Sequence, residues 1–265
     1  MSTRDGYAAG TPCWIDLMTS DVEAATRFYT SLFGWTAEDS HDDDDTWIYT
    51  NFLLDGKVAA GLGRQPEEMT AAGMPPTWAT YVATDDVDAT TARVEQAGGT
   101  VMMPGMDVMD VGRMAIYGDP AGAVVSAWQA GSHRGAQVCN EPGTWSWNEL
   151  MTRDLEAASA FYSAVFGWEY DDMPMPYGTY RVVRGGDEGG LGGLMSMPPN
   201  VPDDIPSYWT VYFTTADLDA SVERVKELGG ALVHGPDDMA GVGRMATVSD
   251  PQGGVFMLMQ PVPQD

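Results

Sequence analysis

The sequence predicts an α+β fold in which four βαβββ modules form two domains of two modules each. The first observation is a duplication, because the stretch from Cys13 to Trp35 recurs nearly unchanged from Ser146 to Trp168, 133 residues later. The second is that each module opens with an apolar strand followed by an Asp-capped helix that ends at glycine. The third is a series of short strand-like runs, separated by turns, after each helix.

Two more blocks extend the duplication over nearly the whole chain. Thr77–Gly99 matches Tyr208–Gly230, and Val111–Gln129 matches Val242–Gln260, both at an offset of 131 residues. The two residues of difference fall near the loop "HDDDD" (His41–Asp45), where a hairpin tolerates insertions.

We therefore place domain 1 at residues 8–130 and domain 2 at residues 143–262. The polar, glycine-containing stretch 130–143 between them is predicted to be a linker.

Helical spacing and capping residues place one helix in each module. Asp21 precedes a run whose apolar residues fall on one helical face, and Gly34 ends it; the face is Val22, Ala25, Phe28, Tyr29 and Leu32. Asp86 or Asp88 starts the second helix, which carries Val87, Thr91, Val94 and Ala97. We expect helices over 22–33, 87–97, 155–166 and 218–228, and strands in runs such as 46–54, 57–63, 113–118 and 123–129. "GDPAG" (Gly118–Gly122) and "SDPQG" (Ser249–Gly253) are turn sequences.

The composition narrows the class of protein. The net charge is −26, from 39 acidic and 13 basic residues, which disfavours nucleic acid and anionic membranes as partners and favours cationic ligands. No segment is typical of a signal peptide or a membrane span. Cys13 and Cys139 do not form a disulfide framework. We expect a cytoplasmic protein with reduced thiols, acting on a small molecule as a monomer or homodimer.

The order of these motifs resembles the vicinal oxygen chelate superfamily, which groups glyoxalases, bleomycin-resistance proteins and extradiol dioxygenases. "RFYTSLFGW", "DDVDA" before "GG", and "DPAG" before a last strand occur in domain 1, and matching motifs occur in domain 2. Within this superfamily, the sequence resembles the tandem two-domain proteins of actinobacteria. This resemblance implies that paired modules form curved mixed sheets that enclose clefts.

The resemblance also implies where a metal ion would be held. Metal-dependent members have a histidine on the first strand seven residues before the capping Asp, a second ligand at the start of the fifth strand, and a Glu seven residues after the Asp of "DPxG". The matching positions here hold Trp14, about Ala79 and Ser126 in domain 1, and Trp147, about Thr210 and Met257 in domain 2. None is a good ligand for a divalent metal, so we expect no metal or other cofactor.

The three histidines do not replace these ligands. His41 lies in the acidic loop, His133 in the linker and His234 just before "GPDD", and we expect none of them on a strand. "HDDDD" could form a cation site, but a solvated loop is the favoured interpretation because runs of like charge stay hydrated.

Side-chain alternation along the strands predicts which residues line the clefts, given that the family's metal position faces inward. The predicted ligand-binding set in domain 1 is Trp14, Asp16, Met18, Tyr81, Ser126 and Trp128. In domain 2 it is Trp147, Glu149, Met151, Tyr212, Met257 and Met259. Aromatic and methionine side chains suit a permissive apolar site, although on strands they also form ordinary core.

Asp16 and Glu149 interrupt otherwise apolar strands, and two interpretations remain open. Each could be a cation anchor or a general base with a raised pKa, which makes them the candidate catalytic residues. Each could instead be a structural acid bonded to backbone amides or to an arginine such as Arg113 or Arg244.

Two functions follow. The first is metal-free binding of a flat, hydrophobic molecule, cationic or neutral, in sequestration or resistance. The alternative is a glyoxalase-like enzyme acting on a small carbonyl or polyketide-like metabolite, with Asp16 or Glu149 as base. The fold alone does not choose between them.

Overall fold

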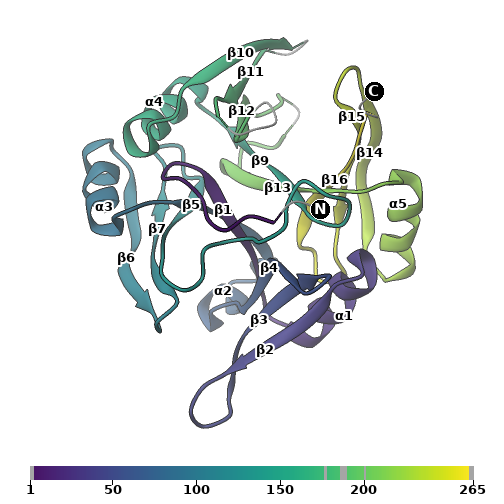
Figure 1. Ribbon diagram of the computed structural model, residues 1–265. Coiled ribbons are helices and arrows are strands. Elements are labelled where there is room, and N and C mark those ends of the chain that lie inside the picture. The colour runs from purple at the N-terminus through teal and green to yellow at the C-terminus, as the bar shows by residue number, and fades with distance from the viewer. Residues whose placement is uncertain (1–2, 176–177, 186–189, 200, 263–265) are drawn as a thin grey trace.

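The computed structural model describes residues 3–175, 178–185, 190–199 and 201–262, which form two curved eight-stranded mixed sheets (Figure 1). Sheet A has the order β2-β3-β4-β1-β5-β8-β7-β6, and sheet B has the order β10-β11-β12-β9-β13-β16-β15-β14. The predicted α+β class with tandem βαβββ modules is confirmed. The bounds 8–130 and 143–262 remain our proposed limits of the two domains.

Sheet A holds the strands of the first two modules. Its strands are β1 (Pro12–Thr19), β2 (Thr36–His41), β3 (Trp47–Leu54), β4 (Lys57–Arg64), β5 (Thr77–Ala83), β6 (Thr100–Val108), β7 (Gly112–Gly118) and β8 (Val124–Ala130). Sheet B repeats them as β9 (Trp145–Thr152), β10 (Tyr170–Met175), β11 (Gly178–Val183), β12 (Gly192–Ser196), β13 (Tyr208–Thr214), β14 (Ala231–Met239), β15 (Gly243–Ser249) and β16 (Val255–Pro261).

The first strands of paired modules join them at the middle of each sheet. β1 pairs with β5 in antiparallel register, with Trp14 opposite Tyr81 and Asp16 opposite Ala79. Within its own module β1 pairs with β4 in parallel register, which places Gly61 beside Asp16. Sheet B uses the same register, with Gly193 beside Glu149. Both acids therefore sit at the centre of a sheet.

The four predicted helices are present, at α1 (Val22–Phe33), α3 (Val87–Gln96), α4 (Leu155–Phe166) and α5 (Leu218–Glu227). A short fifth helix that the sequence analysis did not predict, α2 (Glu67–Ala71), follows β4. Asp21 caps α1 by accepting a hydrogen bond from the Ala24 amide at 3.0 Å. Gly34 ends α1 with a left-handed φ of 72°, a conformation that glycine adopts without a Cβ clash.

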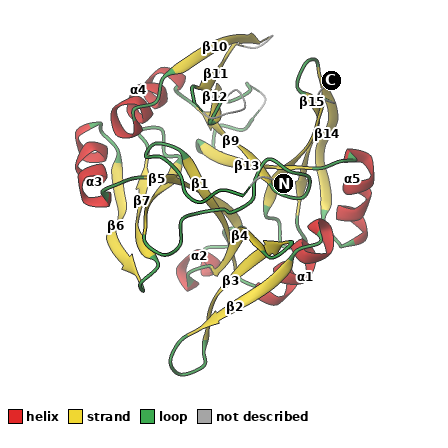
Figure 2. Cartoon of the chain, in the orientation of Figure 1, coloured by secondary structure: helices red, strands yellow, loops and turns green. Residues whose placement is uncertain are grey.

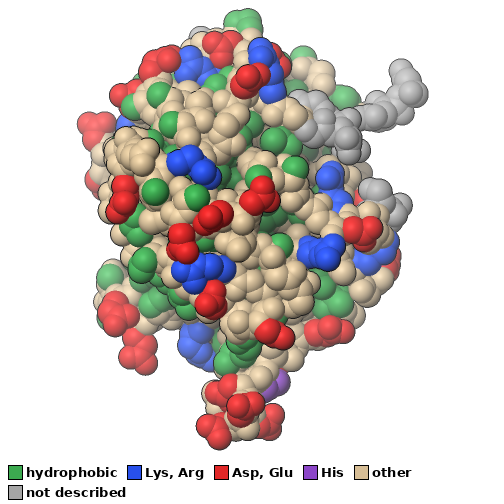
Figure 3. Space-filling view, turned by 60° about the vertical axis from the view of Figure 1, so that its left-hand side comes forward, with side chains coloured by type: hydrophobic (Ala, Val, Ile, Leu, Met, Phe, Trp, Pro, Cys, Tyr) green, Lys and Arg blue, Asp and Glu red, His purple; other side chains and the backbone are tan. Residues whose placement is uncertain are grey.

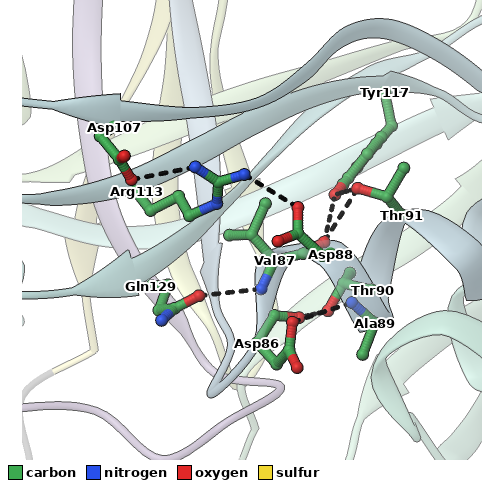
Figure 4. Close-up of polar contacts among 10 residues, drawn as sticks. All are labelled: Asp86, Val87, Asp88, Ala89, Thr90, Thr91, Asp107, Arg113, Tyr117 and Gln129. Atoms are coloured by element: carbon green, nitrogen blue, oxygen red, sulfur yellow. Dashed lines mark hydrogen bonds and ion pairs between the residues drawn. The ribbon is translucent and has the colours of Figure 1, made fainter.

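The start of α3 settles the choice between Asp86 and Asp88 (Figure 4). Asp86 is the cap, since its side chain accepts from the Ala89 amide at 2.9 Å. Asp88 instead pairs with Arg113, whose guanidinium also binds Asp107 at 2.9 Å. At the end of β8, the Gln129 side chain accepts from the Val87 amide and satisfies a further donor of the helix start.

The core between the two sheets is aromatic and draws on both domains. Trp78 of β5 and Phe213 of β13 meet with ring centroids 5.1 Å apart, and Phe256 packs on Phe28 of α1. α1 packs against α5, and α3 packs against α4 (Figure 2). Side chains alternate along a strand, so Asp16 and Glu149 lie on the face of each sheet that points away from this core.

Surface features complete the fold. Acidic side chains gather at the exposed tip of the β2–β3 hairpin, at the bottom of Figure 3. The expectation that no histidine lies on a strand is wrong: His41 ends β2, and His234 belongs to β14 because the ladder with β15 runs past it. Within the described residues, no helix has the length and apolar character that crossing a membrane requires.

Candidate functional site

The carboxylate of Asp16 is the centre of a buried hydrogen-bond cluster on sheet A. Asp16 is 4% exposed, and its Oδ2 accepts from the hydroxyls of Tyr49 and Tyr81, each at 3.0 Å. The indole Nε1–H of Trp14 donates to the Tyr49 oxygen at 3.2 Å. These residues come from β1, β3 and β5, so a chain of donors runs across three strands and ends at the acid.

Sheet B repeats this cluster with Glu149 in place of Asp16. Glu149 is 5% exposed, and its Oε1 accepts from the Tyr212 hydroxyl at 2.9 Å. The Trp147 indole donates to the Tyr180 oxygen at 2.9 Å, and the Tyr180 hydroxyl also hydrogen-bonds Glu149. We call the two sheet faces that carry these clusters the carboxylate face of sheet A and the carboxylate face of sheet B.

Glycine makes room for the tyrosine that reaches each acid. A Cβ on Gly61 would lie 1.9 Å from the Tyr49 hydroxyl oxygen, and a Cβ on Gly193 would lie 2.0 Å from that of Tyr180. The sequence analysis missed Tyr49 and Tyr180. The signal that could have found them is a tyrosine at the same offset of 131 residues, on a strand that pairs with a glycine-containing strand.

The arginine interpretation of these acids is wrong. Arg113 is held by Asp88 and Asp107, and Arg244 is held by Asp219 and Asp238. All four carboxylates lie at helix starts or in strand β6 or β14, away from Asp16 and Glu149. Each acid instead accepts hydrogen bonds from tyrosine hydroxyls, which stabilise a carboxylate without adding a positive charge.

Burial sets the acidity of both carboxyl groups. It raises the pKa of Asp16 to about 6, although the hydrogen bonds from Tyr49 and Tyr81 act in the opposite direction. Burial also raises the pKa of Glu149, again against two tyrosine hydrogen bonds. The Oδ1 atom of Asp16 is buried and has no hydrogen-bond partner among the described residues. A carboxyl group with a pKa near 6 and one oxygen without a hydrogen-bond partner can hold a proton or exchange it near neutral pH.

Other predicted site residues lie on the same faces. Strand register places Ser126 beside Tyr81 on sheet A and Met257 beside Tyr212 on sheet B. Met18 lies over Gly63, where a Cβ would meet its sulfur at 2.8 Å. The two faces differ in exposure at some positions: Trp14 and Trp128 are 3% and 5% exposed, whereas Trp147, Met257 and Met259 are half-buried. Met18 and its counterpart Met151 are both half-buried.

The residues at the positions where the resemblance implies metal ligands have side chains that do not suit a divalent ion. Trp14 and Trp147 present indole N–H groups, which donate hydrogen bonds and lack a lone pair for a metal. Ala79 and Met257 are equally unsuited, since hard and borderline cations take oxygen, imidazole or thiolate. Within the part of the chain that the structure describes, no three His, Cys, Asp or Glu side chains are grouped for metal binding.

Two cavities of about 390 Å³ lie away from the carboxylates. One is bounded by the N-terminal segment and the linker and includes Tyr7, Cys13, Trp128 and Arg134. The other lies at the end of the β14–β15 hairpin and includes Asp238 and Arg244. Neither includes a residue of the tyrosine–carboxylate clusters, so the candidate site rests on those clusters and the side chains around them.

Fold and site together define a duplicated βαβββ protein. Tryptophan stands in each domain at the position where the resemblance implies the first metal ligand. The chain belongs to the Glyoxalase/Bleomycin resistance protein/Dioxygenase superfamily, whose model matches residues 12–126 and 145–258.

Relatives span the full length of the chain. It is 44% identical over 265 residues to CFP32 of Mycobacterium tuberculosis (strain CDC 1551 / Oshkosh), a protein named as a glyoxylase, with all of both chains covered. It is 39% identical to the anthracycline biosynthesis protein DnrV of Streptomyces peucetius, over 96% of this chain and 94% of that protein.

Solved structures share the fold at low identity. The Mn(II)-bound glyoxalase of Novosphingobium aromaticivorans matches with a TM-score of 0.66 and 18% identity, over 96% of this chain and 83% of that one. The 2,2',3-trihydroxybiphenyl 1,2-dioxygenase of Sphingomonas wittichii strain RW1 matches with a TM-score of 0.64 and 13% identity, over 96% and 91% of the two chains.

Proposed function

We propose that the protein binds a flat, hydrophobic aromatic molecule at a carboxylate face, without metal, in a sequestration or resistance role. The observation that carries this proposal is the indole-to-tyrosine-to-carboxylate chain in both domains. It fills the position of the family's first metal ligand with Trp14 and Trp147, and uses each acid to hold tyrosines instead of an ion.

The side chains around Glu149 supply apolar and polarisable surface. Trp147, Tyr180, Met151 and Met195 are half-buried, and register places Met195 directly beside Met151. Met259 of β16 and Met245 of β15 form a second cross-strand pair, on the far side of β13 from the first. Indole gives a flat stacking surface, and methionine adapts its shape to ligands of different outline. Such a lining suits a fused-ring aromatic molecule better than a small polar carbonyl compound.

The electrostatic field and the relatives favour the same ligand class. A net charge of −26 attracts cations at long range, and the buried Glu149 accepts a hydrogen bond from the Tyr212 hydroxyl. The name of the relative DnrV refers to the biosynthesis of anthracyclines, which are fused-ring aromatic compounds. An anthracycline with an amino sugar is therefore a suitable first probe, and its uncharged aglycone is the matching neutral probe.

A glyoxalase-like enzyme is the second candidate, and one observation favours it. Burial brings the pKa of Asp16 to about 6, where a carboxyl group serves as a general acid or base near neutral pH. The glyoxylase name of CFP32 points to the same activity. In this candidate, Asp16 or Glu149 moves a proton on a small carbonyl or polyketide-like substrate.

Titration of indole fluorescence with the two probes tests the proposal. Trp147→Leu should weaken binding by about two- to tenfold or more, because a stacked aromatic pair contributes about 0.5–1.5 kcal/mol and the lost apolar contact area adds to this. Trp47→Leu, which removes a half-buried indole of the β2–β3 hairpin in domain 1, is the matched control and should bind like the wild type. Glu149→Gln should weaken the cationic probe by about 1–3 kcal/mol and spare the aglycone.

The outcome separates the two functions. The enzyme would be favoured by two results together. Neither probe would bind, and the protein would turn over a glyoxalase-type substrate in a reaction that Asp16→Asn or Glu149→Gln abolishes.

A further inference from the structure

We propose that the linker segment 131–135 closes the carboxylate face of sheet A with the His133 ring, so that only the carboxylate face of sheet B is open to ligand. This inference rests on the proposed function and assigns it to one of two duplicated sites. We call segment 131–135 the strap.

The His133 ring lies against both tryptophans of the carboxylate face of sheet A. Its centroid is 4.5 Å from that of Trp14, with the rings nearly perpendicular at 80°, and 5.5 Å from that of Trp128, at 72°. Edge-to-face packing at these distances is a favourable aromatic contact. The imidazole thus occupies the place against Trp14 where an aromatic ligand would stack.

Backbone hydrogen bonds hold the strap in this position. The Val111 carbonyl accepts from the amides of Gly131 and His133, each at 3.0 Å, and the Trp128 indole donates to the His133 carbonyl at 2.9 Å. Gly135 then turns with a φ of 101°, so close to β1 that a Cβ there would lie 2.4 Å from the Cys13 carbonyl oxygen. The stretch predicted to be a plain linker is therefore packed on domain 1, where Ala136 and Val138 are buried.

The two faces differ in the way that the strap requires. Trp14, Ser126 and Trp128 are 3%, 2% and 5% exposed, whereas their counterparts Trp147, Met257 and Met259 are half-buried. The chain leaves both sheets alike, because Val262 donates to the Val242 carbonyl as Gly131 donates to that of Val111. The position that corresponds to His133 is 264, which lies outside the described residues.

A tethered ring competes strongly with a free ligand because its effective concentration is high. The Nε2 atom of His133 is buried without a hydrogen-bond partner among the described residues, so removal of the ring breaks no hydrogen bond at that atom. His133→Gly should therefore open the carboxylate face of sheet A while the fold is kept. Gly135→Ala should displace the strap by a different route, through backbone strain.

Fluorine NMR of protein labelled with 5-fluorotryptophan tests the closure without any ligand. In the wild type, the Trp147 signal should shift between H₂O and D₂O and the Trp14 signal should not. In His133→Gly and in Gly135→Ala, the Trp14 signal should gain the shift, whereas the control His41→Gly, at the exposed hairpin, should behave like the wild type. A solvent shift of Trp14 in the wild type equal to that of Trp147 would overturn the strap.

Binding stoichiometry then tests which site acts. Calorimetric titration with the amino-sugar anthracycline should give one equivalent for the wild type and two for His133→Gly, with the second equivalent lost in His133→Gly/Trp14→Leu. Two equivalents in the wild type, or one in a folded His133→Gly protein whose Trp14 is solvent-accessible, would contradict the assignment. Absence of binding in every variant would sink the proposed function and the assignment of that function to sheet B, while the NMR result would still decide the closure.

Discussion

The hydroxyl of Tyr29, on α1 of domain 1, donates a hydrogen bond to Asp250 Oδ2 in domain 2 at 3.0 Å, and both residues are buried. The reciprocal bond joins Tyr162 of α4 to Asp119 at 3.2 Å. Asp119 and Asp250 belong to the two "DPxG" turns, where the Oδ1 atom of each accepts from a backbone amide of its own turn. Each aspartate therefore stabilises its turn and also binds a tyrosine from a helix of the other domain. This pair of bonds gives the interface its approximate twofold character.

Tyr29→Phe should lower the free energy of unfolding by about 1–3 kcal/mol, because it leaves buried polar groups unpaired. One is Asp250 Oδ2, and the other is the Trp78 indole N–H, which donates to the Tyr29 oxygen at 3.1 Å. Urea denaturation measures the change. Tyr162→Phe should reproduce it through Asp119 and Trp209. Unaltered unfolding midpoints in both variants would show that the interface does not depend on these bonds.

Asp16 should make the stability of the protein fall as pH rises from about 4 to about 6. Its pKa is raised from 3.8 to about 6 on folding, so the folded state binds more protons than the unfolded state in that window. A shift of about two pKa units corresponds to a loss on the order of 3 kcal/mol by the upper end of the window.

The difference in unfolding free energy between the wild type and Asp16→Asn, measured from pH 3.5 to 8, isolates this effect. It should decline through the window and stay flat above it. A difference that does not vary with pH would mean that Asp16 titrates alike in both states.

Gly61→Ala should destabilise the protein by about 1–3 kcal/mol, because the new Cβ would overlap the Tyr49 hydroxyl oxygen. Gly193→Ala should act likewise on Tyr180, whereas Gly118→Ala, whose Cβ would meet nothing closer than 3.8 Å, is the matched control. Thermal unfolding gives the ranking. Adding Tyr49→Phe to Gly61→Ala should cost less than the sum of the two single changes, since one change removes the atom that the other strikes.

The purified protein should carry no stoichiometric zinc, nickel, iron or manganese, and chelators should leave its thermal stability unchanged. The reason is the indole at the family's first metal position in each domain. Elemental analysis and melting curves with and without added Mn²⁺ provide the measurement. About one tightly bound metal ion per domain, with stabilisation on loading, would show that ligands outside the predicted positions form a site.

Much of the architecture follows from the sequence because it depends on local chemistry. An Asp side chain accepts a hydrogen bond from the amide three residues later at the start of each of the four long helices, a contact that closes within one turn. All four helices therefore begin where they were predicted to begin. Alternation along β1 places Trp14 and Asp16 on one face, which their shared partner Tyr49 confirms. The duplication carries the same inference to domain 2.

Tertiary structure alone decided what surrounds these residues. The partners of Asp16 lie 33 and 65 residues away, and Asp250 lies 221 residues from Tyr29, so each pairing depends on which strands adjoin and which turn meets which helix. No local pattern distinguishes Tyr49 from Arg113 as the partner of a buried acid. His133 likewise stands in a polar stretch that predicts a solvated linker, yet packing brings its ring between Trp14 and Trp128. Spacing along the chain fixes hydrogen bonds that close within a turn of helix, whereas contacts between distant strands form only when the two sheets are assembled.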